Sequence, residues 1–447
     1  MKIKCPDYIL TAIKKLEDSG FEAYAVGGCV RDSIMGKEPH DWDMTTSALP
    51  EQILKVFCEY HTIPTGIKHG TVTVMIDGFP IEITTMRIDG EYLDNRRPES
   101  VEFTDRITED LSRRDFTVNA MAYSPQRGTV DIFGGQKDLE NGIIRCVGNP
   151  DKRFNEDALR ILRALRFASV LGFEIDAETS ESLIKNKKLL QNIASERIRV
   201  ELLKLLCGKN VEKILTDYSE VIFEIIPELK PLYGFDQRTK YHVYDIWTHT
   251  VKAVASSKNE PNLRMIALLH DIGKPEKFTV DENGAGHFRG HPAVSEEIAR
   301  EILKRLRFSN KDIEYICKII ALHDLHSNGS KLQLKRWCSK DSVEIMLDTL
   351  DMMRADAAAK NPHFLSTSLE LYDKCENILN EIKEEDACLK LADLEVDGND
   401  IVSLGAKGRE IGDTLSSLLE KVIAGETENE RSALITEAQN ILFGKKI

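Results

Sequence analysis

Two kinds of hydrophobic periodicity divide the chain into a mixed first third and a helical remainder. In the first third, apolar residues alternate with polar ones in three short runs, which predict β-strands at residues 21–26, 71–76 and 79–86. Two further runs repeat at helical spacing and predict helices at residues 7–20 and 50–60. Because strands and helices alternate there, the first third predicts an α/β module.

From about Phe154 onward, the apolar positions follow helical spacing almost throughout. The clearest helical runs are residues 156–173, 195–208, 263–273 and 295–306. Pro and Gly residues interrupt this periodicity at residues 148–150, 227–234 and 361–362. These interruptions predict an α/β module followed by three helical ones, with the boundaries 1–148, 149–234, 235–361 and 362–447.

The composition is that of an ordinary globular protein and argues against several classes. The nine cysteines are scattered without a C-x-x-C pair, which argues against a disulfide framework and against a thiolate zinc site. No apolar run approaches the roughly 20 residues needed to span a bilayer. The N-terminus also lacks the apolar stretch of a signal peptide. We therefore expect a cytoplasmic protein with no membrane partner.

The overall charge is unfavourable for a nucleic-acid-binding protein, because phosphate contacts need a basic surface. The formal net charge is −14 at pH 7. Between Arg145 and Lys213, however, 14 Lys and Arg residues stand against 10 Asp and Glu residues. This local excess is compatible with an RNA-binding face, although a mildly basic helical stretch is more often an ordinary solvated face.

The segment Ala25–Thr46, AVGGCVRDSIMGKEPHDWDMTT, combines a glycine turn with two carboxylates. The predicted strand ends in Gly27 and Gly28, and glycine lets the backbone approach a phosphate at the start of the helix that follows. Asp41 and Asp43 are two residues apart on a β-type segment, so both carboxylates project from one face. Magnesium prefers such oxygen ligands and shares them with substrate phosphates. A bare D-x-D is usually a polar turn, but the Gly-Gly-x-x-Arg-Asp before it favours a site for magnesium and a triphosphate.

This segment resembles the first motif of the tRNA nucleotidyltransferase and bacterial poly(A) polymerase family. Four more motifs resemble that family in the same order: LSRRDFTVNAMAYS, DIFGGQKDL, EDALRILRALRFA and SERIRVEL. Together they cover about the first half of the chain. The resemblance implies a polymerase-β-like head, with a small mixed sheet and helices, followed by an all-α neck.

The resemblance also implies roles for individual residues of the first motif. Asp41 and Asp43 would bind the catalytic Mg2+ ions, activate the RNA 3′-hydroxyl and neutralise the α-phosphate. Gly28 and Arg31 would hold the triphosphate.

Two adjacent arginines of the second motif, Arg113 and Arg114, are implied as phosphate and base contacts. Arginine presents a planar fork that suits bidentate recognition of oxygen atoms, and the sequence leaves open which of the two makes the contact. Glu82, in a predicted strand, is a candidate third carboxylate, although a glutamate at a strand edge is more often merely solvated.

Base selection is implied for the fourth motif. On its predicted helix, Asp157 and Arg160 are three residues apart and so are neighbours on one face, and Arg163 and Arg166 follow at the same spacing. Cytosine and adenine present an amino donor beside a ring-nitrogen acceptor, whereas uracil and guanine present a carbonyl there. An Asp acceptor next to an Arg donor matches only the first two bases, which implies selection of CTP and ATP. The alternative is a surface salt bridge.

Members of this family differ in product. The segment TGIKHGTVTVMIDG resembles the CCA-adding and A-adding branch. The loop Arg87–Phe103 has its full length, whereas a shortened loop in this family marks enzymes that stop after CC. We therefore expect addition of C, C and A to tRNA. An A-adding or CC-adding enzyme and a poly(A) polymerase are the alternatives.

Seven of the eleven histidines fall between His242 and His326. Single histidines are usually structural, but the segments WTHT, LLHDIGKP, FRGHP, IALHD and RADAAAKN resemble HD-type metal phosphohydrolases in the same order, over residues 241–361. The resemblance implies ligands of a first divalent metal and two further histidines nearby: His249, His270, Asp271 and Asp356, then His291 and His323. Such ligands suit Mn, Ni, Fe or Mg, with a bound water as nucleophile. Hydrolysis of phosphoester or 2′,3′-cyclic phosphate ends and a purely structural role both stay open.

The tail from Val396 to Leu419 has Gly405, Gly408 and Gly412 between helical segments and resembles the tRNA-contacting C-terminal region of the family. The expected partners are therefore tRNA, CTP and ATP. Two other classes of function compete with this interpretation: a signalling phosphohydrolase with an inactive nucleotide-sensing N-terminal module, and an RNA-binding adaptor. The intact carboxylates and arginines of the first and fourth motifs argue against both.

Overall fold

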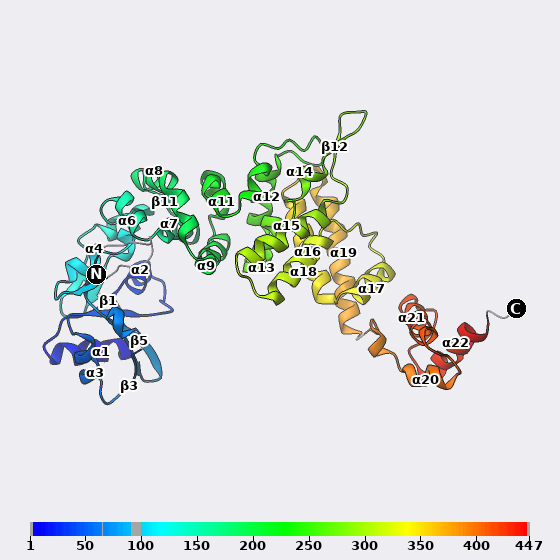
Figure 1. Ribbon diagram of the computed structural model, residues 1–447, viewed down its shortest axis with the longest axis horizontal. Helices are drawn as coiled ribbons and strands as arrows, with labels where there is room; N and C mark the ends of the chain where they lie inside the picture. The colour runs from blue at the N-terminus through cyan, green and yellow to red at the C-terminus, as the bar shows by residue number, and fades with distance from the viewer. Residues whose placement is uncertain (1–2, 65, 91–99, 386, 445–447) are drawn as a thin grey trace. The chain divides into compact units, whose positions relative to one another are not determined.

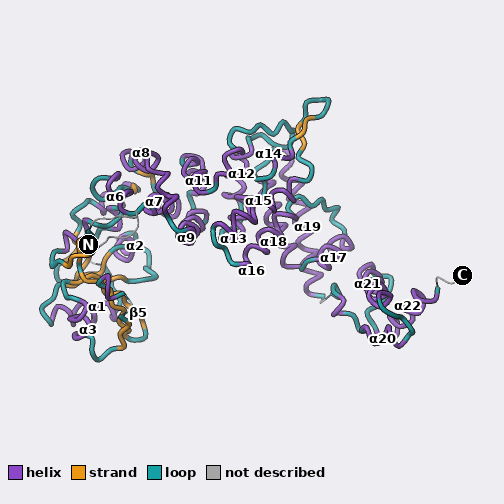
Figure 2. The backbone as a smooth tube through the Cα atoms, viewed as in Figure 1, coloured by secondary structure: helices purple, strands orange, loops and turns teal. Residues whose placement is uncertain are grey.

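The computed structural model describes residues 3–64, 66–90, 100–385 and 387–444. The chain divides into an N-terminal unit, Met1–Lys230 with Arg305–Phe308, and a C-terminal unit, Pro231–Lys304 with Ser309–Ile447. Figure 1 gives the order of the helices and strands, and Figure 2 distinguishes them by type. Residues 91–99 of the loop that bears on the expected product lie outside the described residues, so the inference from its length stays a prediction.

The head is built on a seven-stranded sheet with the strand order β3-β4-β5-β2-β1-β8-β9. Its strands are β1 (Ala23–Val26), β2 (Asp43–Thr46), β3 (His61–Ile63), β4 (Thr71–Ile76), β5 (Phe79–Thr85), β8 (Ala122–Ser124) and β9 (Gly128–Val130). β2 and β5 are parallel and the other neighbours are antiparallel, which confirms the expected mixed sheet. The three predicted strands are confirmed as β1, β4 and β5.

Helices flank this sheet. They are α1 (Asp7–Asp18), α2 (Gly28–Ile34), α3 (Pro50–Val56), α4 (Ile107–Ser112) and α5 (Gly135–Asn141), with the 3-10 helices η1 (Ile67–His69) and η2 (Thr117–Asn119). α1 buries Ile9, Ala12, Ile13 and Leu16, a stripe with helical spacing, and packs against β1. α1 and α3 confirm the two helices expected in this region, and Figure 1 shows both beside the strands. A separate hairpin pairs β6 (Arg87–Asp89) with β7 (Val101–Phe103).

The neck continues the N-terminal unit and is helical. Its elements are β10 (Ile143–Ile144), α6 (Pro150–Glu156), α7 (Leu159–Leu171), β11 (Glu174–Ile175), α8 (Ala177–Asn186), η3 (Lys187–Asn192), α9 (Ser195–Leu206), α10 (Val211–Asp217), α11 (Ser219–Ile225) and η4 (Pro227–Leu232). The prediction of one continuous helix over residues 156–173 is wrong, because Asp157, between α6 and α7, has extended backbone angles. Its carboxylate accepts a hydrogen bond from the Leu159 amide at 3.1 Å. Such local bonding favours the start of a helix over its interior.

A helical bundle forms the larger part of the C-terminal unit. Its elements are α12 (Ile246–Ser256), α13 (Pro261–Leu269), α14 (Lys274–Lys277), α15 (His291–Arg305), α16 (Asn310–Leu322), α17 (Lys331–Lys340), α18 (Val343–Ala358), η5 (Pro362–Phe364) and α19 (Leu365–Glu384). α13 is buried on nearly all sides against α12, α16 and α18, as expected of a central apolar helix. The prediction of an almost wholly helical chain after Phe154 is confirmed. The exceptions among the described residues are β11 and a hairpin of β12 (Thr279–Val280) and β13 (Gly286–His287).

The tail has a small apolar core of its own. It consists of η6 (Leu391–Asp393), α20 (Gly398–Ser403), α21 (Arg409–Ala424) and α22 (Arg431–Phe443). The buried residues of this core are Leu394, Val396, Ile401, Ala406, Leu418, Leu434 and Ala438. Gly405 and Gly408 have positive φ in the turn before α21, but Gly412 lies inside α21 and not between helices as expected. Within the described ranges, no helix combines the length and the apolar character that crossing a membrane requires.

Candidate functional site

The glycine turn after β1 is the first part of the site in the head. Gly27 has a φ of 83°, a left-handed conformation that glycine adopts without strain, and α2 begins at Gly28. A Cβ atom added to Gly27 would lie 3.1 Å from Nη1 of Arg114. The expected strand-turn-helix is therefore present, and a guanidinium lies directly against the turn.

Three carboxylates occupy neighbouring positions on the head sheet. Asp41 and Asp43 are exposed while Trp42 between them is buried, so the expected alternation is present although β2 begins only at Asp43. Glu82 on β5 is the register partner of Asp43 on β2. In the described residues, the carboxylate oxygens of these three side chains do not all lie within 4.8 Å of one another. The ligand atoms of the histidine and aspartate groups in the C-terminal unit do.

The environment of Asp43 reflects this concentration of negative charge. Although Asp43 is solvent-accessible, the surrounding protein partly desolvates its carboxylate and raises its pKa, and the Glu82 carboxylate raises it further, with a smaller effect from Asp41. Arg114 acts in the opposite direction. A divalent cation between the carboxylates would relieve the repulsion that raises this pKa, so these residues fit a site for divalent metal.

The two adjacent arginines of the second motif have different surroundings. Both contact Asp110, which is fully buried, at 2.8 Å from Arg113 and 3.3 Å from Arg114. Arg113 also lies 3.7 Å from Asp89 on β6, whereas Arg114 reaches the Gly27 turn. Sequence reasoning missed Asp110. The signal available was an acidic residue three and four positions before the two arginines.

Hydrogen bonds tie Arg31 on α2 to the neck helix α7. Arg31 Nη1 donates to the Asn119 side-chain oxygen at 2.7 Å, and Asn119 Nδ2 donates to Asp115 at 3.2 Å. Asp115 accepts from Arg163 on α7 at 2.6 and 2.8 Å. Burial opposes ionisation of Asp115, but Arg163 outweighs it and lowers the Asp115 pKa to about 2. Asn119 and Asp115, which sequence reasoning did not single out, therefore hold Arg31 in place.

The other end of α7 is held by a buried carboxylate on α9. Glu201 is 6% exposed and lies 2.7 Å from Arg166 and 3.9 Å from Arg163. Arg163 and Arg166, both expected to contact nucleotide, thus have carboxylate partners within the protein. The SERIRVEL motif supplies Glu201, and its helical spacing was the signal for a residue that faces α7.

Asp157 and Arg160 do not pair with each other. Asp157 lies 3.1 Å from Arg197, and Arg160 lies 2.7 Å from Glu156, with a second bond to the Arg113 carbonyl at 3.0 Å. The prediction that they are neighbours on one helix face is therefore wrong, because the helix is interrupted at Asp157. Each side chain is nevertheless oriented by partners of its own.

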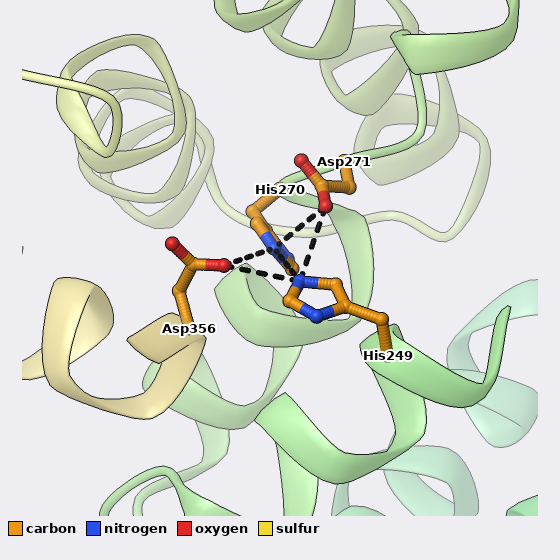
Figure 3. Close-up of side chains that lie close together, drawn as sticks. All are labelled: His249, His270, Asp271 and Asp356. Atoms are coloured by element: carbon orange, nitrogen blue, oxygen red, sulfur yellow. Dashed lines mark hydrogen bonds and ion pairs between the residues drawn. The ribbon is translucent and has the colours of Figure 1, made fainter. Parts of the chain in front are cut away.

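The C-terminal unit brings four of the expected metal ligands together (Figure 3). His249 is on α12, His270 and Asp271 follow α13, and Asp356 is on α18. His249 Nε2 lies 3.0 Å from Asp356 and 3.3 Å from Asp271, and His270 Nε2 lies 3.2 Å from Asp271. All four side chains are buried. Burial opposes protonation of His270, but Asp271 and Asp356 outweigh it and raise the His270 pKa to about 9, so the site favours a cation.

A second group shares one residue with the first. Asp271, His291 and His323 form it, and their ligand atoms lie within 4.8 Å of one another. Asp271 Oδ1 lies 3.2 Å from His291 and 3.7 Å from His323, while its Oδ2 faces His249 and His270. Asp271 therefore stands between two groups of ligand atoms, one at each carboxylate oxygen.

Backbone carbonyls fix the orientation of all four imidazoles. Each Nδ1 faces a carbonyl oxygen, at 3.1 Å for His249 and Ala359, 2.9 Å for His270 and Ala267, 2.9 Å for His291 and Phe288, and 2.6 Å for His323 and Ile320. With a metal ion bound, each imidazole would be neutral, donate from Nδ1 and direct the lone pair of Nε2 into the groups. This second layer of contacts is characteristic of histidine metal ligands.

A cavity of about 540 Å³ opens onto both groups. Lys274 lies 2.7 Å from Asp271 and Lys360 lies 2.5 Å from Asp356, and both line the cavity. His242 also lines it, and burial together with the Lys274 ammonium lowers the His242 pKa to about 2, so this ring is neutral. Sequence reasoning missed both lysines, although Lys274 belongs to the LLHDIGKP segment.

Three family models match the chain in succession. A model described as the poly A polymerase head domain matches residues 23–145, and one described as the probable RNA and SrmB-binding site of polymerase A matches residues 172–232. A model described as the HD domain matches residues 241–394.

Relatives match nearly the whole chain. A CCA-adding enzyme of Ligilactobacillus salivarius is 33% identical over 446 residues, which cover 98% of this chain and 96% of the relative. One of Levilactobacillus brevis is 34% identical over 95% of each chain. The crystal structure of the Bacillus stearothermophilus CCA-adding enzyme in complex with CTP has a TM-score of 0.73, with 27% identity over 98% of both chains. With the fold, the carboxylates and these end-to-end likenesses taken together, the chain belongs to the family of CCA-adding enzymes.

Proposed function

We propose that the protein adds C, C and A from CTP and ATP to the 3′ end of tRNA and releases pyrophosphate. The observation that carries this proposal is the set of carboxylates at Asp41, Asp43 and Glu82, together with a glycine turn against which the Arg114 guanidinium lies. Similar proteins that are named CCA-adding enzymes support the choice of product over poly(A).

The experiment that tests this product uses two RNA substrates and single nucleotides. Purified protein is incubated with tRNA that lacks CCA, or with tRNA that ends in CC, and with each labelled nucleoside triphosphate separately. We expect C from CTP on the first RNA and A from ATP on the second. Incorporation of A alone would mean an A-adding enzyme, and incorporation of C alone a CC-adding enzyme.

In the proposed reaction, the 3′-hydroxyl oxygen of the RNA forms a bond to the α-phosphorus. The bond from that phosphorus to the oxygen bridging to the β-phosphate breaks, pyrophosphate leaves, and the hydroxyl proton passes to solvent. Mg2+ held by Asp41 and Asp43 would neutralise charge at the α-phosphate and favour loss of the hydroxyl proton. Glu82 would complete the carboxylate set. Arg31 and Arg114 would position the triphosphate, and Gly28 would let the backbone approach it.

We propose that Asp157 and Arg160 select the base, although the two side chains do not pair and each has a different partner. Asp157 is fixed by Arg197 and by the Leu159 amide, so its free lone pairs can accept the amino group of cytosine or adenine. Arg160, fixed by Glu156, would donate to the ring nitrogen. Because both bases present this pattern and uracil and guanine do not, one pair of side chains can serve two nucleotides.

Replacing Asp157 by alanine should relax base choice more than it weakens triphosphate binding. We expect the ratio of kcat/KM for CTP over UTP to fall by about 10-fold or more, since one good base contact contributes about 1–3 kcal/mol of discrimination. Steady-state kinetics with all four triphosphates measure the ratio. Asp217→Ala, an exposed carboxylate of α10, is the matched control. An unchanged ratio in Asp157→Ala would reject this role.

Alanine substitution should also show which of the two adjacent arginines contacts the triphosphate. Arg114→Ala is expected to raise the KM for CTP and ATP by about 10-fold or more, because it removes a charge-assisted contact to the triphosphate. Arg113→Ala is expected to change KM less, since Arg113 is committed to Asp110 and Asp89. Initial rates as a function of triphosphate concentration distinguish the two, with thermal melting as the check on folding. The reverse order of KM values would assign the contact to Arg113.

We further propose that the HD domain holds two divalent cations, Mn, Ni, Fe or Mg, and hydrolyses phosphoester or cyclic phosphate ends. The four inward-facing Nε2 atoms and the shared Asp271 support it. Metal bound at these ligands would supply an activated water as nucleophile. In the reaction, water forms a bond to phosphorus, the ester P–O bond breaks, and the leaving oxygen takes a proton. Lys274 and Lys360 would attract the anionic substrate.

Contact with tRNA is proposed for the residues from Arg145 to Lys213 and for the tail. The first has a local excess of basic residues, and the second has a glycine-containing turn before α21. Solved CCA-adding enzyme complexes with tRNA, ATP and CTP support these partners in proteins of the same fold.

A further inference from the structure

The aromatic ring of Phe167 on α7 lies close to three guanidinium groups. The Cζ atoms of Arg166, Arg31 and Arg163 lie 4.0, 5.2 and 5.4 Å from the ring centroid. Arg163 and Arg166 belong to α7 itself, whereas Arg31 comes from α2. Phe167 is buried, and an aliphatic side chain could fill that space, but only an aromatic ring presents a negative face that attracts cations. Packing alone therefore does not explain a ring at this position.

A second aromatic residue fixes the orientation of the Phe167 ring. Phe116 is fully buried and meets Phe167 edge-to-face, with 5.8 Å between ring centroids and 77° between ring planes. The Phe116 amide donates to the Asp115 carboxylate at 2.8 Å, and the same carboxylate accepts hydrogen bonds from Arg163. A ring held in this way can determine where a guanidinium packed against it lies.

The three guanidinium groups repel one another. Burial lowers the pKa of Arg166, Glu201 acts in the opposite direction, and the positive charges of Arg163 and Arg31 lower this pKa further. The like charges on α7 push Arg31 away from that helix, and the attraction of the Phe167 ring acts in the opposite direction. A bound anion would relieve the repulsion, so the cluster favours a negatively charged ligand.

The hydrogen bonds of Arg31 leave part of its guanidinium available for such a ligand. Nε and Nη2 of Arg31 donate to the Asp32 carboxylate at 2.8 and 3.0 Å, and Nη1 donates to Asn119 at 2.7 Å. Among the described residues, these bonds use three of the five N–H donors of the guanidinium, which leaves two for a ligand. A Cβ atom added to Gly28 would lie 3.7 Å from Arg31 Nη2, so these donors are beside the glycine that begins α2.

We propose that Phe167 is a positioning residue that holds the Arg31 guanidinium where it meets the triphosphate. The inference rests on the proposed function, in which Arg31 positions that group. Phe167 acts through Arg31 and not by its own contact with the nucleotide. Because Phe167 and Arg160 both belong to α7, the ring also connects the triphosphate contact to the helix proposed to select the base.

Replacing the ring by an aliphatic side chain tests the inference in the full-length protein. Phe167→Leu should raise the KM for CTP and for ATP by about 5-fold, with kcat little changed, because the contact between Arg31 and the ring is lost. The rise should be equal for the two nucleotides, since both carry the same triphosphate. Phe167→Tyr keeps the ring and should retain the wild-type KM. Phe57→Leu, at a fully buried phenylalanine of the head, controls for loss of a buried ring and should also retain it.

A second measurement requires neither tRNA nor turnover. Calorimetric titration with CTP in the presence of Ca2+ gives the dissociation constant of each variant. Phe167→Leu should weaken CTP binding by about 5-fold. Combined with Arg31→Ala, it should weaken binding no further than Arg31→Ala alone, because the ring acts through that arginine. Thermal melting shows whether each variant is folded.

These outcomes separate the inference from the proposed function. If Phe167→Leu weakens CTP binding only when Arg31 is present, but the wild-type protein adds no C or A to tRNA, the inference is retained and the proposed reaction is rejected. An unchanged dissociation constant in folded Phe167→Leu, while the wild type adds C and A, would overturn the inference alone. Equal loss of affinity with and without Arg31, or unchanged CTP binding in Arg31→Ala, would also overturn it.

Discussion

Replacing Asp43 by alanine should abolish transfer of C and A alike. Asp43 is the carboxylate on which the other charges of the head converge, with Glu82 opposite it in the sheet and Arg114 nearby. Loss of even an outer contact to a metal ligand costs about 10–100-fold in activity, so loss of a proposed ligand should cost more than about 100-fold. Because the proposed metal acts at the α-phosphate, the loss should be equal for CTP and ATP.

Two measurements check this result. One is incorporation of C on tRNA that lacks CCA, and the other is incorporation of A on tRNA that ends in CC. Asp43→Asn removes the charge but keeps the shape, and it should show the same loss. Glu140→Gln, an exposed carboxyl on α5, is the control and should keep wild-type activity. A variant at position 43 that loses A addition but keeps C addition would contradict the role assigned to Asp43.

Replacing His270 by alanine should remove the bound metal from the HD domain. Release of inorganic phosphate by that domain should be lost as a result. His270 is fully buried, and its Nε2 faces both Asp271 and Asp356 (Figure 3). We expect metal affinity to fall by more than about 100-fold, by the same comparison with outer contacts. Elemental analysis of purified protein measures the metal, and a phosphate assay measures hydrolysis. Addition of C and A should persist, because the head carboxylates belong to the other unit.

Controls separate a lost ligand from a lost fold. His270→Gln keeps most of the volume of the buried side chain, so it limits the cavity that alanine would leave. His363→Ala, at an exposed histidine of η5, should keep its metal. Thermal melting shows whether each variant is folded. Equal metal content in wild type and folded His270 variants would exclude the site.

Local patterns predicted much of the head and the neck. The alternation in residues 71–76 and 79–86 corresponds to β4 and β5, because side chains in strands point to opposite faces by simple geometry. The same pattern placed Trp42 inside and its two neighbours outside. It failed at residues 156–173, since apolar spacing continues across Asp157 while the backbone does not. A carboxylate that bonds to an amide two residues ahead is invisible to periodicity.

In the C-terminal unit as well, the sequence predicted some features of the site and missed others. The resemblance to HD-type phosphohydrolases implied His249, His270, Asp271 and Asp356 as a group, and the structure brings their ligand atoms together. The sequence did not predict that the two oxygens of Asp271 face different histidine pairs. That arrangement depends on how α12, α13, α15, α16 and α18 pack, because the histidines come from separate helices.

By itself, the sequence determined the types of element, their order and the chemical groups available for metal and phosphate, because each follows from residues close together in the chain. Only the tertiary structure decided which groups meet. The parallel register of β2 and β5 sets Glu82 beside Asp43. The guanidinium that lies against the turn at Gly27 belongs to Arg114 and not to Arg113. Such pairings depend on contacts between segments far apart in sequence, whose register and packing no local pattern records.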